Sequence, residues 1–230
     1  MSKTALDAQG RIHDMPRQVA ARESETSLRR PAILLALFVG VWTALAIAPW
    51  YRQDWLLENL VVFAALPLLV LTARRRRFSD AAYALLFLFL CLHEVGAHYT
   101  YSQVPYDEAF RHLTGRSLNE LLGFRRNHYD RVVHFLYGLL LLPLSVELFD
   151  AAAPPRGVWR FLLPVLFIES HSACFELIEW AAAVVFGGDL GQAYLGTQGD
   201  AWDAQWDMLL ALLGALLAQT ALFAVRRRRR

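Results

Sequence analysis

The sequence predicts an all-α protein that crosses a membrane as a bundle of about six helices, and two observations support this prediction. The 230 residues are 56% hydrophobic and only 19% charged, and their mean hydropathy of +0.31 is too high for an ordinary soluble domain. In addition, six stretches of the chain reach or approach the roughly 20 apolar residues that a helix needs to cross a bilayer.

The expected spans follow one another along most of the chain. They run over Pro31–Pro49, Trp55–Ala73, Asp80–His98, Tyr129–Phe149, Gly157–Phe186 and Trp202–Val225. The fifth span is long and contains Pro164, so we expect it to be tilted, kinked or partly interfacial. We expect residues 1–30 to form a polar cytoplasmic tail, residues 31–225 to form one membrane domain, and residues 226–230 to form a basic cytoplasmic tail.

The basic residues predict the orientation of the bundle. If both termini are cytoplasmic, 17 of the 23 Lys and Arg residues fall in inside segments, among them the block 74–77 and the tail 226–230. Cytoplasmic loops of membrane proteins carry an excess of Lys and Arg, so this arrangement is favoured over the reverse one. The basic blocks are then topology determinants that can at most contact anionic lipid, and we expect no nucleic-acid partner.

Ionisable side chains recur at helical spacing near one end of the last four expected spans. An ionised group costs about 2.5 to 3.5 kcal/mol on insertion scales at the centre of a membrane helix, so such a cluster implies a function. The predicted topology places all of these residues at the outer side, where a bundle would bring them into one site. They are Glu94 and His98, Asp130 and His134, Glu176 and Glu179, and Asp200, Asp203 and Asp207.

The residue types in this cluster are those of a divalent-metal site. Imidazole nitrogen and carboxylate oxygen bind Zn, Mn, Fe or Mg according to geometry, and the sequence leaves the identity of the metal open. Glu176 or Glu179 is then a candidate catalytic residue, a general base that activates water. The candidate metal ligands are Glu94, His98, Asp130, His134, Asp203 and Asp207.

Other interpretations of the same residues remain open. Asp130 with Arg131, or Glu94 with an arginine of another helix, would form ion pairs that lock the packing of the bundle. Asp203 near the start of the last helix would complement its positive end, whereas Asp207 lies too far inside the helix for that role. Paired histidines on membrane helices also bind haem, although the surrounding carboxylates argue against it.

Several classes of enzyme are disfavoured because their motifs are missing. The sequence contains no Gly-x-Ser-x-Gly motif of a serine hydrolase, no P-loop, and no Gly-x-Gly-x-x-Gly motif after a strand. Both cysteines, Cys91 and Cys174, lie inside expected spans, which argues against a disulfide framework. The loop between the third and fourth spans has an amphipathic stretch around Phe110 and Leu118 that is expected to lie on the outer leaflet and cover the site.

Four strings in the sequence resemble those of one membrane-protein family. They are Gly-Ala-His-Tyr-Thr-Tyr, Asn-His-Tyr-Asp-Arg-Val-Val-His-Phe, Glu-Leu-Ile-Glu-Trp and Leu-Gly-Thr-Gln-Gly-Asp-Ala-Trp-Asp-Ala-Gln-Trp-Asp-Met. They are similar to motifs of the YjdF family of bacterial inner-membrane proteins, also called DUF2238, from the first span to the last. The resemblance implies a polytopic protein of the inner membrane, and it carries over no reaction and no catalytic residue.

A shorter likeness concerns two patterns only. Asp-x-x-x-His-Phe on one helix and the Asp-rich start of the last helix resemble VanZ-like membrane proteins, which are associated with glycopeptide-antibiotic tolerance and the cell envelope. This chain departs from that pattern because it adds Glu94, His98, Glu176 and Glu179.

Two functions of different classes follow from the sequence. The first is a metal-dependent hydrolase or transferase that acts at the outer leaflet on a lipid or a lipid-linked envelope substrate. The second is a carrier of ions or protons, or a lipid-binding accessory protein without catalytic activity. The carrier hypothesis predicts a polar path inward from the cluster through Glu169 and His171 toward Glu147, and the enzyme hypothesis predicts a closed site that opens sideways to lipid.

Overall fold

The structure is a computed structural model that describes residues 28–75, 77–188, 191 and 195–228. Most of the expected N-terminal tail and the last two residues of the basic tail therefore lie outside the described residues. All elements in the described part of the chain are helices, which confirms the predicted all-α fold.

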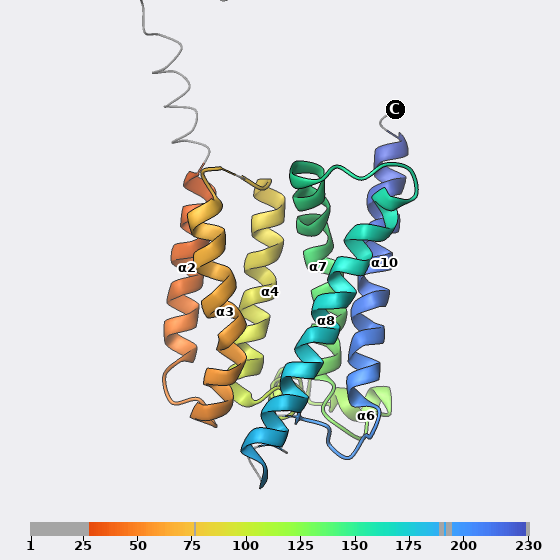
Figure 1. Ribbon diagram of the computed structural model, residues 1–230. Coiled ribbons are helices and arrows are strands. Elements are labelled where there is room, and N and C mark those ends of the chain that lie inside the picture. The colour runs from red at the N-terminus through yellow and green to blue at the C-terminus, as the bar shows by residue number, and fades with distance from the viewer. Residues whose placement is uncertain (1–27, 76, 189–190, 192–194, 229–230) are drawn as a thin grey trace, which may run out of the picture.

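Six long helices and two short ones make up the described chain (Figure 1). The two short helices, α5 and α6, lie in the connection between α4 and α7. In order, the elements are α2 (Arg29–Leu45), α3 (Arg52–Thr72), α4 (Asp80–Tyr99), α5 (Tyr106–Thr114), α6 (Leu118–Leu122), α7 (Tyr129–Ala152), α8 (Trp159–Phe186) and α10 (Asp203–Arg228).

Five of the long helices, α3, α4, α7, α8 and α10, are long and apolar enough to cross a membrane. The sixth, α2, has 17 residues and ends at Leu45, short of the expected end at Pro49. Ala48 has a positive φ of 49° and precedes Pro49, and both features are incompatible with a continuing helix. The chain is therefore a polytopic helical membrane protein in which α2 is the shortest of the long helices.

The long helices form two groups of three (Figure 1). Helices α2, α3 and α4 lie on one side and α7, α8 and α10 on the other, with α4 packed against α7. The start of α2 and the C-terminal end of α10 lie at the same end of the bundle (Figure 1). This is the arrangement expected if both termini are on the same side of the membrane, and the assignment of that side to the cytoplasm remains a prediction.

Helix α8 crosses the bundle at a clear tilt, as expected for the longest span (Figure 1). Its 28 residues are too long to lie upright in the roughly 30 Å hydrocarbon core of a bilayer. Pro164 lies in its second turn and removes the hydrogen bond that Arg160 O would accept. Gln219 of α10 compensates, since its Nε2 donates to Arg160 O and Phe161 O at 2.9 Å each.

Glycines hold α7 and α10 in close contact. A Cβ atom on Gly138 of α7 would collide with the carbonyl oxygen of Ala211, and one on Gly214 of α10 would collide with the carbonyl oxygen of Phe135. Close approach through small residues is a common way for helices to associate in membranes. The sequence separation between Gly138 and Ala211 equals that between His134 and Asp207. Because α7 and α10 run in the same direction (Figure 1), this contact fixes the register of the polar residues one turn away.

Candidate functional site

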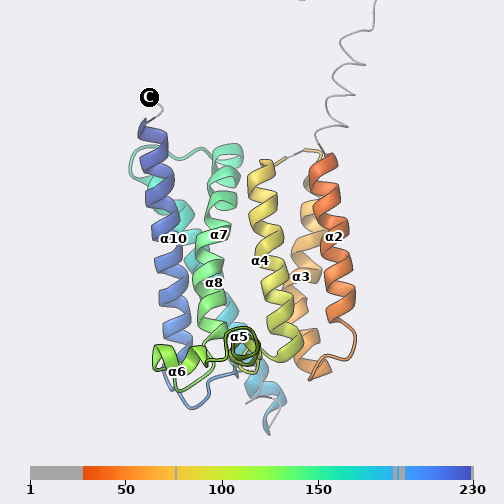
Figure 2. The same ribbon diagram turned by 180° about the vertical axis from the view of Figure 1, so that it is seen from behind.

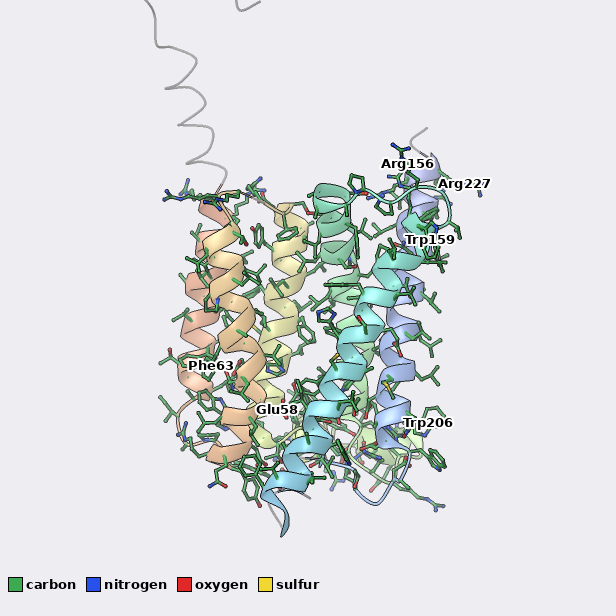
Figure 3. All side chains as sticks on the ribbon, viewed as in Figure 1. Glu58, Phe63, Arg156, Trp159, Trp206 and Arg227 are labelled. Carbon is green, nitrogen blue, oxygen red and sulfur yellow. The ribbon has the colours of Figure 1, made fainter. Side chains whose placement is uncertain are left out.

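Buried polar residues gather at one end of the bundle, where α4 and α8 end and α3, α7 and α10 begin. Figure 3 shows this concentration of nitrogen and oxygen atoms at the lower end of the bundle. At the opposite end, Leu142, Val146, Ile168 and Ala215 belong to an apolar core shared by α7, α8 and α10. The buried polar residues include Asp54, Glu58, Glu94, His134, Glu176, Glu179, Asp203 and Asp207.

Asp130, His134 and Asp207 form the centre of this cluster. One potential ligand atom from each of the three side chains lies within 4.8 Å of the other two. His134 and Asp130 are one turn apart on α7, with 3.5 Å between His134 Nε2 and Asp130 Oδ1. Asp207 comes from the second turn of α10 and is only 2% exposed. The structure thus brings together three of the six residues predicted as metal ligands.

Glu176 of α8 adds a fourth group at this place. Its Oε1 lies 3.4 Å from His134 Nε2, so the imidazole has one carboxylate of its own helix, that of Asp130, and one of α8 beside it. Neither Glu176 Oε1 nor Asp207 Oδ1 has a hydrogen-bond partner among the described residues, although both atoms are buried. A buried carboxylate oxygen without a partner costs free energy, and a bound cation would remove that cost. The donor set therefore fits a divalent cation.

Glu179 lies one turn after Glu176 and is 9% exposed. Its carboxyl group is within electrostatic range of Glu176, Asp130 and Asp207. Both predicted catalytic residues therefore face the cluster of acidic residues, and neither points toward lipid.

Asp203 lies beside the central group, but arginines hold its carboxylate. Arg126 Nη1 is 2.7 Å and Arg131 Nη2 is 3.0 Å from Asp203 Oδ1, and Arg126 Nη2 donates to Oδ2 at 3.0 Å. Arg131 also pairs with Asp200 at 2.6 Å. This geometry agrees with the alternative of an ion pair that locks packing, although the arginines pair with Asp203 and Asp200 instead of Asp130.

The arginines of these ion pairs lower the pKa values of neighbouring groups at the starts of α7 and α10. The pKa of Asp200 is lowered, first by the hydrogen bond that its carboxylate accepts from the backbone amide of Trp202 and then by the hydrogen bond from the guanidinium of Arg131. Burial lowers the pKa of His128, and the positive charges of Arg131 and Arg126 lower it further. At neutral pH the groups at the starts of α7 and α10 therefore include an ionised Asp200, two arginines and the neutral imidazole of His128.

Glu94 and His98 do not share a site with each other. The His98 Nδ1 atom is 2.7 Å from the carbonyl oxygen of Leu45, so its ring is tied to the C-terminal end of α2. Glu94 is fully buried, and its Oε2 accepts a hydrogen bond from Asn59 Nδ2 of α3 at 3.4 Å. His98 therefore joins the end of α4 to the end of α2, whereas Glu94 belongs to the part of the polar cluster between α3 and α4.

Asp54, Glu58 and Asn59 of α3 were not identified from the sequence. They are 1%, 3% and 0% exposed, and both carboxylate oxygens of Asp54 and Glu58 Oε2 have no hydrogen-bond partner among the described residues. Figure 3 places Glu58 on the side of α3 toward α8, and its carboxyl group is within electrostatic range of Asp130, Glu94 and Glu176. Asp54 and Glu58 are four residues apart in an apolar span, the same pattern that identified Asp130 and His134.

His93 and Tyr101 form a further buried pair that the sequence did not reveal. Tyr101 Oη lies 2.5 Å from His93 Nδ1. The ring of Tyr101 occupies the space that a side chain at residue 96 would need, which explains the glycine there. Tyr129 Oη donates to Leu92 O at 2.8 Å and joins α7 to the same turn of α4.

The connection between α4 and α7 lies across this end of the bundle, as the amphipathic stretch predicted (Figure 2). Asp107 organises it, since its carboxylate accepts hydrogen bonds from the Asn119 amide at 2.8 Å and from Ser117 Oγ at 3.0 Å. These hydrogen bonds, that of the Asn119 amide first, lower the pKa of Asp107. Tyr106 Oη accepts a hydrogen bond from the His128 amide at 3.0 Å, which fixes the connection to the start of α7.

Together the fold and the site define a polytopic helical membrane protein with a buried cluster of carboxylates and a histidine. The chain belongs to the DUF2238 family, whose sequence model, described as a predicted membrane protein, matches residues 30–229. It is similar to the inner membrane protein YjdF of Escherichia coli strain K12, with 39% identity over 177 residues that cover 76% of this chain and 79% of that protein.

These comparisons confirm the resemblance drawn from the four sequence motifs. They also confirm that the chain is a multi-pass protein of the inner membrane. No solved structure matches the chain.

Proposed function

We propose that this protein is a metal-dependent hydrolase or transferase that acts on a lipid or a lipid-linked envelope substrate. The observation that carries the proposal is the group of Asp130, His134 and Asp207, whose ligand atoms lie within 4.8 Å of one another in a buried place. One imidazole with two or three carboxylates is a ligand set that suits Zn, Mn or Fe.

The chemistry of the neighbouring residues supports an enzyme. A divalent cation at this site would supply Lewis acidity toward a phosphoryl or carbonyl oxygen. Glu176 is placed to accept a proton from an attacking water, because its Oε1 is buried, lacks a hydrogen-bond partner among the described residues and lies 3.4 Å from His134 Nε2. Glu179, one turn further along α8, is a second carboxylate that can take up the proton.

The position of the site supports a substrate from the membrane. The cluster lies at one end of the bundle, and the connection with α5 and α6 covers that end (Figure 2). The ends of a spanning bundle are expected at the depth where lipid headgroups meet the hydrocarbon. A headgroup phosphate or ester can reach this depth without leaving the bilayer, whereas a soluble substrate would have to pass the covering connection.

The carrier hypothesis receives less support from the structure. His171 is exposed and its Nδ1 lies 2.8 Å from Phe167 O of its own helix, so it does not continue a path from the cluster. Glu147 of α7 accepts a hydrogen bond from the Ser79 amide at 2.7 Å, and this contact joins α7 to the start of α4. Between these places α7, α8 and α10 share an apolar cluster around Leu142 and Ile168, and the polar group nearest to it on the expected path is Glu169, whose Oε2 is buried without a hydrogen-bond partner among the described residues.

The enzyme proposal is tested with purified protein in mild detergent and a panel of phosphatidic acid and polyprenyl diphosphate. Release of inorganic phosphate should require added Zn²⁺ or Mn²⁺ and should fall at least about 100-fold in Glu176→Gln, in line with the loss of a general base. Glu169→Gln, on the same helix, is the matched control and should retain the wild-type rate. Equal rates in wild type and Glu176→Gln, or release without any metal dependence, would overturn the proposal.

A further inference from the structure

A cavity of about 250 Å³ lies at the end of the bundle opposite the polar cluster. It is bounded by the first turns of α2, the last turns of α3 and the first half of α4. All of its lining residues are apolar except Arg74 and Tyr83, and it is partly open to the surroundings of the bundle.

An apolar cavity of this size accommodates a hydrocarbon chain. A cavity of about 150 Å³ lined by aliphatic and aromatic residues stays free of water and binds benzene, so about 250 Å³ suffices for a longer alkyl segment. The outer surfaces of α2 and α3 are rich in exposed leucines and valines, as expected for helices that contact lipid. Lipid acyl chains are therefore the apolar ligand that surrounds the opening at the highest concentration.

The charges at the mouth of the cavity favour an anionic headgroup. Arg74 and Arg75 follow the end of α3, and Arg29 and Arg30 stand at the start of α2. Arg30 and Arg77 are paired with Asp80 at 2.9 and 2.6 Å, whereas Arg74 has no ion-pair partner within the described part of the chain. A free guanidinium at the membrane surface is a strong ligand for a phosphate group.

Tyr83 supplies a second polar group for such a ligand. Its hydroxyl is buried, and it finds no hydrogen-bond partner among residues 28–75 or the other described residues. A donor just inside the mouth of an apolar cavity is suited to the ester carbonyl that joins an acyl chain to its headgroup. We propose that this cavity binds one acyl chain of an anionic phospholipid, with the lipid phosphate on Arg74 and an ester carbonyl on Tyr83.

Native mass spectrometry of the whole protein in detergent tests this proposal. We expect one tightly retained phosphatidylglycerol, bound in preference to phosphatidylethanolamine, and no displacement by inorganic phosphate. Arg74→Gln should weaken phosphatidylglycerol binding about tenfold and remove the preference, because a charge-assisted hydrogen bond is lost. Arg156→Gln is the matched control, because Figure 3 shows Arg156 at the same end of the molecule but on the other group of helices.

Two variants that fill the cavity distinguish lipid bound in this cavity from lipid that adheres elsewhere on the surface of the bundle. Leu35→Trp and Leu69→Trp each place a larger side chain in the cavity, and a variant that keeps the wild-type circular dichroism and elution volume should lose the bound lipid. Unchanged binding in a folded filling variant would overturn the proposed site. Equal affinity for phosphatidylglycerol and phosphatidylethanolamine in wild type would overturn the role of Arg74.

Discussion

Asp207 and Glu176 carry the least satisfied atoms of the central cluster. Asp207 is 2% exposed, and its Oδ1 has no hydrogen-bond partner among the described residues. Burying a carboxylate oxygen without a partner is costly, because the group loses its hydration and gains no hydrogen bond in return. The burial of Asp207 without a partner for Oδ1 is therefore better explained by a role as a metal ligand than by a purely structural role.

Asp207→Asn should therefore have opposite effects on thermal stability, relative to wild type, in the absence and in the presence of metal. In the presence of chelator we expect the variant to unfold about 2–5 °C higher than wild type, because one of several acidic groups that repel one another in a buried cluster is gone. With added Zn²⁺ or Mn²⁺ the wild type should gain stability by mass action and the variant should not. Differential scanning fluorimetry measures both, with the exposed Glu108→Gln as control. A variant that is less stable than wild type in chelator would contradict this account of Asp207.

The covering connection should depend on pH through Asp107. Its folded-state pKa lies below the ordinary value of 3.8, so its stabilising effect is complete above that value and disappears as the pH falls through the folded pKa. We expect the Asn119 amide, which donates to Asp107, to lose protection from hydrogen exchange in that acidic range. Asp107→Asn should reduce this protection roughly fivefold at pH 7, since a neutral amide oxygen accepts the hydrogen bond of the Asn119 amide less strongly than a carboxylate does, whereas Glu108→Gln should not. Protection that stays constant down to pH 2 would contradict the prediction.

At the scale of the elements, contact between α7 and α10 decides whether a site exists. The small residues at Gly138 and Ala211 allow the two backbones to touch, and the same register brings His134 next to Asp207. The site therefore depends on packing one turn farther into the bundle.

Gly138→Val should separate the two helices and weaken metal binding without a change in any ligand. The new side chain collides with the backbone of Ala211, which costs about 1–3 kcal/mol of stability and shifts α10 away from His134. Metal affinity measured by equilibrium dialysis should fall about tenfold or more. Gly40→Val on α2 is the matched control, because a Cβ there meets no atom within 4 Å. Equal losses of affinity in both variants would argue against a role for this register.

Gln219 should stabilise the contact of α8 with α10. Gln219→Leu leaves the Arg160 carbonyl, which has no helical donor because of Pro164, without a partner and also removes the hydrogen bond to Phe161 O, so we expect a loss of about 1–2 kcal/mol. Thr220→Val is the control, because the Thr220 hydroxyl is exposed and bonds only to Leu216 O of its own helix. Unfolding in a detergent and denaturant titration distinguishes the two, and equal stability of both variants would contradict the assignment.

For the whole molecule, the sequence predicted the helices well because each one needs a long apolar segment. It predicted only part of the site, because side-chain contacts depend on how each helix is rotated. Asp130, His134, Asp207 and Glu176 meet as expected, since spacing and depth alone bring them to one end. His98 faces α2, and Asp203 is held by Arg131 of α7 and by Arg126 of the preceding loop, whose path the sequence pattern does not specify.

The account also explains the division of the bundle into a polar end and an apolar end. Acidic residues from α3, α4, α7, α8 and α10 meet at one end, while the other end holds an apolar core and an apolar cavity beside arginines. A protein that conducted ions across the membrane would need polar groups through its full depth. Among the described residues the buried acidic groups are concentrated at one end of the bundle, and the apolar cavity lies at the other.

The central claim is that the polar cluster binds a divalent metal. Elemental analysis of protein purified in mild detergent without chelator tests it, with His134→Ala and Asp207→Asn as site variants and the exposed His171→Ala as control. We predict close to one metal ion per chain in wild type and in His171→Ala, and loss of that metal in both site variants. Folded wild-type protein that contains no metal after supply of Zn²⁺ and Mn²⁺, or site variants that retain it, would contradict the claim.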